Sequence, residues 1–450
     1  MATKAKNVIN ENTSLLSLTG PMFFELLLII CLNNIDTLML GHYSVNAVGA
    51  VGNANQLMSL VILMFNIIAT ATSVVVAQYL GAKEHKKMNT IYTLAFGFNL
   101  VIGVLLSICL VLFKEPYMNL INVPDIMRAD AAVYTNLVGG CLFLQACYNV
   151  MVQILRCNGY TKVGMYISLI VNVINICGNY LFLYGPLSGL NFGVKGVAIS
   201  TVVARTVALL VALVVFFRKK IGRIAVRYII PFPKRLLFKM INIGIPSAGE
   251  NVSYSLYQLV LLSFINSMGN DAVNAKVFCQ SLISFAIVFS NSAAMATQII
   301  TGHLVGAGKE EAAYKRVFQT LKISMPVTIG IAVINWLICP YTLRFFTDNE
   351  SIIRVGCYIM FVDIFIEIGR CLNLTFVNSL KAAGDCMYPL IIGLITMWGF
   401  GVTVGYGLGI FFGLGVAGVF AGTACDEIIR GLIVMRHWTK RKWIGKKVVE

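Results

Sequence analysis

Apolar residues run through this chain in long segments that recur from one end to the other. A membrane-spanning helix needs about 20 such residues, whereas a barrel strand shows about ten residues of alternating character. The pattern therefore predicts an all-α polytopic membrane protein with twelve transmembrane helices. The predicted spans are 15–40, 48–80, 90–113, 131–155, 163–184, 194–217, 240–265, 274–303, 318–340, 352–380, 387–410 and 413–435.

The composition agrees with this class, since 58% of the 450 residues are hydrophobic and 12% are charged, against about 25% charged in soluble proteins. The net charge of +16 could indicate nucleic acid, but most Lys and Arg residues fall in alternate connections between spans. The positive-inside rule then places both termini in the cytosol, and we expect no nucleic-acid partner. The cysteines lack metal-binding spacing and no P-loop occurs, so we expect no metal cofactor and no ATP-driven step.

The second half of the chain repeats the first at an offset of 225 residues. Pro21 matches Pro246, Glu25 matches Glu250, and Gly81-Ala82 matches Gly306-Ala307. Each half holds six predicted spans, so the halves are two parallel six-helix lobes, an arrangement typical of transporters with a substrate site between repeats. The predicted parts are an N-lobe at 1–217, a cytosolic basic linker at 218–239, a C-lobe at 240–436 and a basic cytosolic tail at 437–450.

Several short motifs give these spans a family resemblance. They include 36–41 (DTLMLG), 155–159 (LRCNG), 175–182 (NICGNYLF), 244–251 (GIPSAGEN) and 380–385 (LKAAGD). In this order the chain resembles the bacterial branch of the multidrug and toxin extrusion (MATE) family over nearly its whole length. The resemblance implies a MATE-like fold in the bacterial inner membrane. It also implies export of amphipathic, often cationic organic compounds in exchange for H⁺ or Na⁺.

Asp36 is the first candidate for the ion-coupling site, because a carboxylate near the bilayer centre costs about 2.5–3.5 kcal/mol on insertion scales. The family resemblance groups it with Asn175, Asn179 and Thr201. These oxygens suit sodium, whereas burial of the carboxylate favours a proton. Many relatives carry a second Asp where this chain has Asn179, so the smaller number of carboxylates here favours the proton.

Other acids in the spans are candidates for the substrate cavity. Glu25 and Glu250 each follow a proline by four residues, and a proline permits a helix to bend. They could attract cationic substrates, or they could satisfy polar groups that the bend frees. Tyr254 and Glu367 complete the predicted cavity residues.

Two pairs of opposite charge lie at helical spacing. Glu367 and Arg370 are three residues apart and Asp426 and Arg430 are four apart, so each pair is interpreted as a gating or structural salt bridge. Arg205 has no partner at such spacing, and Asp36 or Glu25 could reach it from another span.

Two alternatives compete with cation export. A lipid-linked saccharide flippase of the same superfamily would use cationic residues in its cavity, whereas the charge inside these spans is mostly acidic. A membrane-embedded enzyme would need clustered Asp or a catalytic His pair, and the four His residues lie at span ends or in loops. We therefore expect no enzymatic activity. The expected partners are a small-molecule organic substrate and the lipid bilayer, and nothing in the sequence requires more than a monomer.

Overall fold

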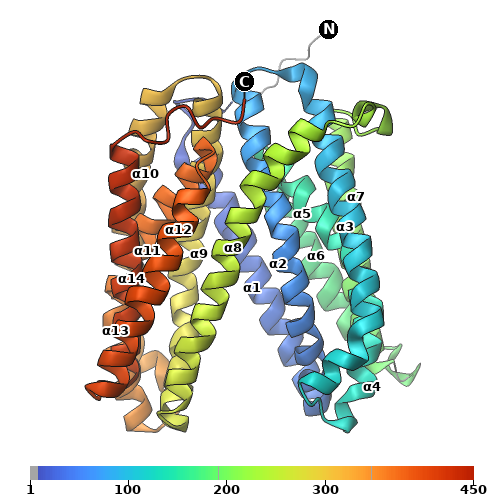
Figure 1. The fold of residues 1–450 in the computed structure, drawn as a ribbon. Coiled ribbons are helices and arrows are strands. Elements are labelled where there is room, and N and C mark those ends of the chain that lie inside the picture. The colour runs from blue at the N-terminus through green and yellow to red at the C-terminus, as the bar shows by residue number, and fades with distance from the viewer. Residues whose placement is uncertain (1–8, 191, 346, 450) are drawn as a thin grey trace. The chain divides into compact units, whose positions relative to one another are not determined.

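The computed structural model describes residues 9–190, 192–345 and 347–449, and these residues are almost entirely helical. In the first half, the helices are α1 (Leu15–Tyr43), α2 (Val45–Gly81), α3 (His85–Leu120), α4 (Asp125–Tyr134), α5 (Leu142–Cys157), α6 (Thr161–Leu183) and α7 (Gly193–Arg218). In the second half they are α8 (Lys234–Asn266), α9 (Asn270–Gly306), α10 (Glu310–Leu343), α11 (Glu350–Ala383), α12 (Met387–Thr396), α13 (Thr403–Tyr406) and α14 (Gly415–Thr439). Figure 1 shows their order along the chain.

These helices correspond to the twelve predicted spans when two series of shorter helical segments are each counted as one span. A π-helical segment, Thr135–Gly139 (η1), follows α4, and the chain then bends by 43° into α5. In the second half, α12, α13 and their π-helical segments η4 (Met397–Val402) and η5 (Gly407–Phe411) make one span of 25 residues. The all-α fold class of the prediction is confirmed.

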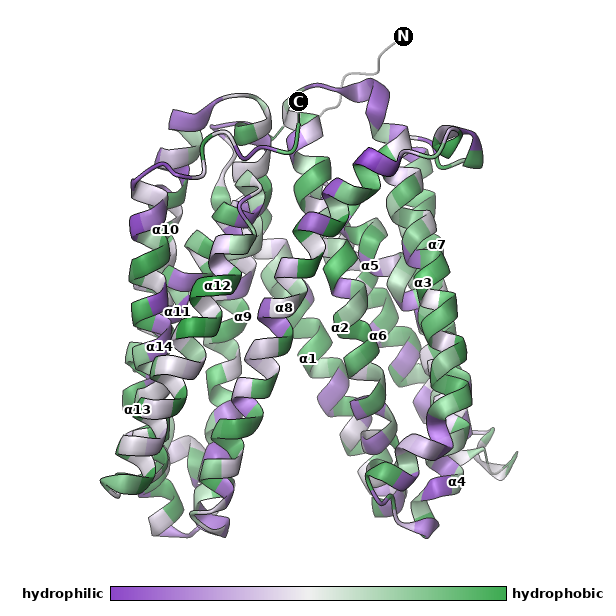
Figure 2. Cartoon of the chain, viewed as in Figure 1, coloured by the Kyte–Doolittle hydropathy of each residue, from purple (hydrophilic) through white to green (hydrophobic). Residues whose placement is uncertain are grey.

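Hydropathy distinguishes the spans from one another. Eight helices described here are long and apolar enough to cross a membrane, and α4–η1 with α5 forms a ninth as a bent pair. Green predominates along most helices in Figure 2, and purple gathers at their ends. Several helices also run past the predicted apolar windows. Thus α8 begins at Lys234 rather than 240, because helical hydrogen bonding continues into polar sequence at a span's end.

The chain divides into two compact units. The described part of the first consists of Phe24–Val76 and Glu84–Gly244; the second takes Ile9–Phe23, Ala77–Lys83 and the chain from Ile245. Three boundaries thus fall inside the helices α1, α2 and α8, and a fourth, between Lys83 and Glu84, lies in the loop before α3. The predicted N-lobe also includes residues 1–8, with Lys4 and Lys6, which lie outside the described residues.

Each unit has its own buried apolar cluster. In the first unit, Phe65, Leu142 and Val197 belong to a cluster shared by α2, α5 and α7. In the second, Tyr257, Leu343 and Met397 join α8, α10 and η4. Lipid is as apolar as these side chains, so close packing rather than removal from water must hold the helices together.

Glycines supply that close packing in the second unit. A Cβ added to Gly422 would lie 2.5 Å from Gly405 Cα, and one added to Gly418 would lie 2.6 Å from the backbone N of Gly409. The helix that follows η5 therefore packs backbone to backbone on the η4–η5 span. Gly401, Gly405 and Gly409 stand four residues apart in the sequence, a spacing typical of close helix packing.

The segment after α14 folds back on the second unit. Trp438 and Trp443 are fully buried and stack with ring centroids 4.3 Å apart. Lys446 Nζ then reaches Asp385 at 2.7 Å, and the backbone N of Val448 donates to Gln78 Oε1 at 2.7 Å. The end of α2 is thereby tied to the C-terminal segment of the same unit.

A second contact at the end of α2 repeats the sequence symmetry. A Cβ on Gly81 would lie 2.0 Å from the carbonyl O of His303, and a Cβ on Gly306 would lie 2.0 Å from that of Gln78. Both obstacles are backbone atoms, so no side chain could move aside to relieve the clash.

We expect Gly306→Ala to lower the midpoint of thermal unfolding in detergent. Overpacking of this kind costs about 1–3 kcal/mol. Gly97→Ala is the matched control, because Gly97 is also helical and has nothing within 4 Å of its added Cβ. The control should be neutral or stabilising, as Ala favours a helix over Gly. Equal unfolding midpoints for the two variants would contradict this close backbone contact between α2 and α9.

Candidate functional site

In the first unit, Asp36 on α1 lies against the polar face of α6. Asn179 Nδ2 donates to Asp36 Oδ1 at 2.8 Å and also to Asn175 Oδ1 at 2.9 Å. Asn175 Nδ2 donates in turn to Thr201 Oγ1 of α7 at 3.2 Å. Residues 175 and 179 are one helical turn apart, so both amides share the face of α6 that meets α1 and α7. The structure thus brings the four predicted ion-coupling residues into one network.

The network leaves acceptor oxygen atoms available. Asn179 is fully buried, yet its Oδ1 has no hydrogen-bond partner. Asp36 is half-buried and no ion pair to it is found among the described residues. A buried acceptor without a donor is costly, and here it stands beside an uncompensated carboxylate. A cation or a proton would relieve both.

Arg205 does not compensate Asp36 directly. The predicted partners of Arg205, Asp36 and Glu25, are both engaged elsewhere, and its Nη1 is buried without a hydrogen bond. The phenol of Tyr134 lies near Thr201 and Asn55 and feels the charges of both Arg205 and Asp36. Tyr134 is therefore a neighbour of the network that the sequence pattern did not single out.

Glu25 and Glu250 occupy equivalent ion pairs, one in each unit. Arg156 Nη2 lies 2.7 Å from Glu25 Oε2, and Lys381 Nζ lies 2.7 Å from Glu250 Oε2. All four side chains are largely buried. The bases belong to motifs that match at the same offset of 225, so the repeat itself held the signal for these partners.

The second unit concentrates charge on α11 and α14. Arg370 Nη1 donates to Glu367 Oε1, and Arg430 Nη2 lies 2.6 Å from Asp426 Oδ2. Glu427, which is absent from the predicted site, lies 3.6 Å from Arg430 and accepts a hydrogen bond from Asn373 at 2.8 Å. Pairing lowers the free-energy cost of burying these charges. In each pair the acid and the base lie on the same helix, three or four residues apart, so the helix itself keeps them close.

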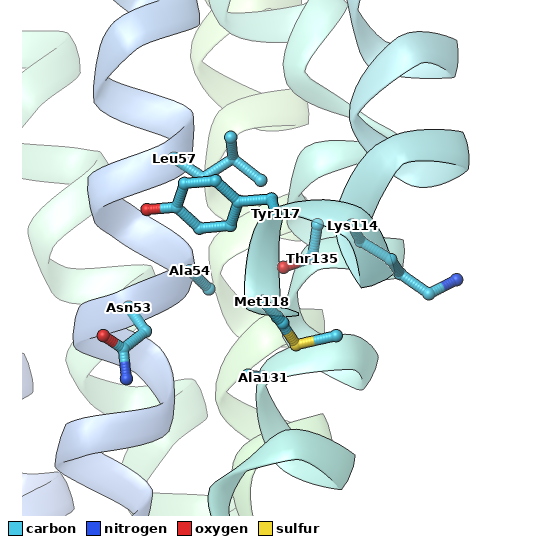
Figure 3. Close-up of a pocket in the computed structure, with 8 residues that line it drawn as sticks. All are labelled: Asn53, Ala54, Leu57, Lys114, Tyr117, Met118, Ala131 and Thr135. Carbon is cyan, nitrogen blue, oxygen red and sulfur yellow. The ribbon is translucent and has the colours of Figure 1, made fainter. Parts of the chain in front are cut away.

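Asp363 and Tyr254 line a cavity in the second unit. Its volume is about 70 Å³, and Arg370 also reaches its wall. Tyr254 is thus a cavity residue of its own unit, whereas Glu367 faces Arg370 rather than the cavity. The first unit also has a shallow depression, drawn in Figure 3, where Lys114 points away from Tyr117 and Met118. That depression has no room for a water molecule and is no candidate site.

Comparison with known proteins identifies the family. The MatE family profile matches residues 21–181 and 246–407, one match in each half. The uncharacterized transporter YisQ of Bacillus subtilis (strain 168) is 35% identical over 446 residues, covering 99% of this chain and 98% of that protein. The probable multidrug resistance protein NorM of Thermotoga maritima is 24% identical over 442 residues, covering 97% and 94%.

The fold also has solved counterparts. A crystal structure of MATE in the bent conformation superposes with a TM-score of 0.89 at 19% identity and covers 98% of both chains. The protein belongs to the MatE family, a class of multi-spanning membrane transporters. It is therefore a transporter and not an enzyme, and the two relatives named above are bacterial.

We expect Glu25→Gln to destabilise the protein strongly, because it leaves Arg156 buried without a counter-charge. Breaking a buried pair from one side costs about 3–5 kcal/mol. The measurement is the midpoint of thermal unfolding in detergent. Glu84→Gln is the control, since Glu84 pairs with Lys87 at an exposed position and such pairs contribute little. If both variants have the same unfolding midpoint as the unmodified protein, the ion pair between Glu25 and Arg156 does not stabilise the fold.

Proposed function

We propose that the protein is a secondary active antiporter. It exports amphipathic, cationic organic compounds in exchange for protons or sodium, by alternating access in the bacterial plasma membrane. The basic excess in alternate connections supports a cytosolic position for both termini. The monomer is the proposed working unit, with the N-lobe, linker, C-lobe and tail as its parts.

The observation that carries the proposal is the oxygen network around Asp36. Asp36, Asn175, Asn179 and Thr201 offer a carboxylate, two amide oxygens and a hydroxyl, with Asn179 Oδ1 buried and unpaired. Hard oxygen ligands suit sodium, and a single carboxylate among neutral groups also suits a proton. Coupling by either cation fits the multidrug resistance role that the names of the more distant relatives carry.

The helix that carries Asp36 supports a link between ion binding and conformation. Residues of α1 up to Phe23 belong to the second unit and those from Phe24 to the first, and Pro21 lies next to this boundary. A proline inside a helix removes a hydrogen bond and makes bending easier. Cation binding at Asp36 can then favour one shape of α1, and a ligand shifts a conformational equilibrium by its differential affinity for the two states.

The charge distribution favours a cationic cargo over the diphosphate of a lipid-linked saccharide. Arg156, Arg370 and Arg430 are each paired with a carboxylate, and among the described residues Arg205 of α7 is a buried arginine without such a pair. The three paired side chains are therefore engaged and do not offer a free cationic cradle. Glu250 is likewise paired with Lys381, so an effect of Glu25 or Glu250 on cargo would act through these ion pairs.

The first test uses purified protein in liposomes loaded with a fluorescent organic cation, with a pH or a sodium gradient applied separately. We expect one gradient to drive the dye and Asp36→Asn to reduce movement to the level of empty liposomes without loss of folded protein. Asp125→Asn is the control, as the Asp125 side chain is 99% exposed. Normal coupled transport by Asp36→Asn would falsify the mechanism. If neither gradient moves the dye, cation export fails and a lipid-linked saccharide is the next cargo to assay.

A second variant tests the ligand set. Asn179→Asp places another carboxylate beside Asp36, and we expect the half-saturating sodium concentration for transport or binding to fall about tenfold. Asn172→Asp is the matched control, because Asn172 lies on the same helix but donates to the carbonyl O of Leu28 instead. An identical response to both substitutions would show that the effect is general to α6 and not specific to the Asp36 network.

A further inference from the structure

The linker between α7 and α8, residues 218–239, carries positive charge that nothing nearby in the sequence balances. It holds eight Lys and Arg residues and no acidic residue. Seven of the eight are exposed, and none of the seven forms an ion pair with another described residue. These seven are Arg218, Lys219, Lys220, Arg223, Arg227, Lys234 and Arg235.

The basic segment after α14 differs from the linker in this respect. Arg441 Nη2 lies 2.6 Å from Glu311 Oε2, and Lys446 Nζ lies 2.7 Å from Asp385 Oδ2. Bases of that segment therefore find acids within the second unit. The linker bases have no such acids, so a partner for them must come from outside the chain.

The linker backbone is fixed to the first unit. The backbone N of Arg223 donates to Asn89 Oδ1 at 2.8 Å, and that of Ala225 donates to Thr93 Oγ1 at 3.3 Å. Both acceptors belong to α3, and Figure 1 shows the linker beside the ends of α3 and α7. A basic surface that is already in place loses less conformational entropy when it binds a partner than a free loop would.

Apolar side chains are exposed among these bases. Val226 is 68% exposed, Ile230 is 71% exposed and Phe232 is 51% exposed. Exposed apolar side chains rimmed by charge mark sites of contact with membranes or proteins. Bases on one side and large apolar side chains on the other are typical of segments that lie at the boundary between headgroups and acyl chains.

The start of α8 adds a second electrostatic feature. Lys234 and Arg235 stand in the first turn, which contains no acidic residue. The N-terminal end of a helix is the positive end of its dipole, so bases there are unfavourable and an anion is favourable. A phosphate group beside this turn would be attracted by the two side chains and by the helix end together.

We propose that the linker is a binding surface for anionic phospholipids of the adjacent leaflet. The exposed bases contact the headgroup phosphates, and Val226, Ile230 and Phe232 enter the upper part of the acyl region. Clusters of four to eight bases beside a transmembrane helix attract anionic headgroups in this way. A nucleic acid would satisfy the bases but leave the three apolar side chains in water, and a neutral lipid would do the reverse.

The proposal goes beyond the positive-inside rule. That rule needs only an excess of Lys and Arg in a connection, wherever their side chains lie. It does not require a backbone fixed to α3 or exposed apolar side chains between the bases. Lipid binding by the linker is also independent of the ion that drives transport.

The test is the midpoint of thermal unfolding of the purified protein in detergent, with added phosphatidylglycerol or phosphatidylcholine of the same acyl chains. We expect phosphatidylglycerol to raise the midpoint by about 4 °C more than phosphatidylcholine, because a ligand that binds the folded state stabilises it. Glycerol phosphate, the anionic headgroup without acyl chains, should not reproduce this difference. Equal effects of the two lipids, or an equal effect of glycerol phosphate, would overturn the proposal.

Two variants with the same loss of charge locate the effect. The linker variant, which should lose at least half of the difference between the lipids, carries Lys219→Gln, Lys220→Gln, Arg223→Gln and Arg227→Gln. The control variant, which should keep the difference, changes four exposed bases elsewhere: Lys86→Gln, Lys322→Gln, Lys440→Gln and Lys442→Gln. Equal losses in the two variants would show that net charge, and not the linker, determines the response.

A second measurement applies if the linker variant does not yield folded protein. A photoactivatable phosphatidylglycerol is crosslinked to the unmodified protein, and the labelled peptides are identified by mass spectrometry. We expect peptides from 218–239 to be labelled and excess unlabelled phosphatidylglycerol to suppress that label. Labelling confined to other peptides would overturn the proposal. Because no ion gradient is applied, a negative result is distinct from failure of transport coupled at Asp36.

Discussion

The buried ion pair that follows a proline is the constraint on which both halves of this transporter depend. Pro21 and Pro246 lie within a few residues of a boundary between the two compact units, and each lies inside the first helix of its half. Four residues later, Glu25 and Glu250 are each held by a base at 2.7 Å within one unit. The proline makes bending easier, and four residues later the ion pair holds the helix in place. The helix can change shape at the boundary without losing its place in the unit beyond it.

The two fixed points differ chemically although they match in sequence. Arg156 presents a planar fork with five N–H donors, whereas Lys381 is a point charge on a flexible stem. The Arg156–Glu25 pair is also somewhat less exposed than the Lys381–Glu250 pair. The first unit therefore holds its helix through a more rigid contact than the second.

Local regularities of the sequence predicted the fold, whereas the grouping of Asp36 with Asn175, Asn179 and Thr201 came from the family resemblance. Span length, the repeat at 225 residues and the spacing of Asn175 and Asn179 are each visible along the chain. The partners of Glu25 and Glu250 lie more than 130 residues away, and only the matched motifs hinted at them. Tyr134 and Glu427 had no such signal, because their contacts arise from the way separate helices pack. The burial of Asp363 likewise could not be predicted, because it depends on where α8, α9 and α14 lie.

Two carboxylates differ from the other acids inside the described spans. Glu25, Glu250, Glu367, Asp426 and Glu427 each have a basic partner. Asp36 and Asp363 have none, and they lie in different units. Since an unpaired carboxylate inside a membrane is expensive, retaining one in each unit requires a function for each. Asp36 faces neutral oxygen ligands, which favours an inorganic cation or a proton. Asp363 faces a small cavity with basic and amide groups on its wall, which is a different surrounding from the neutral oxygens around Asp36.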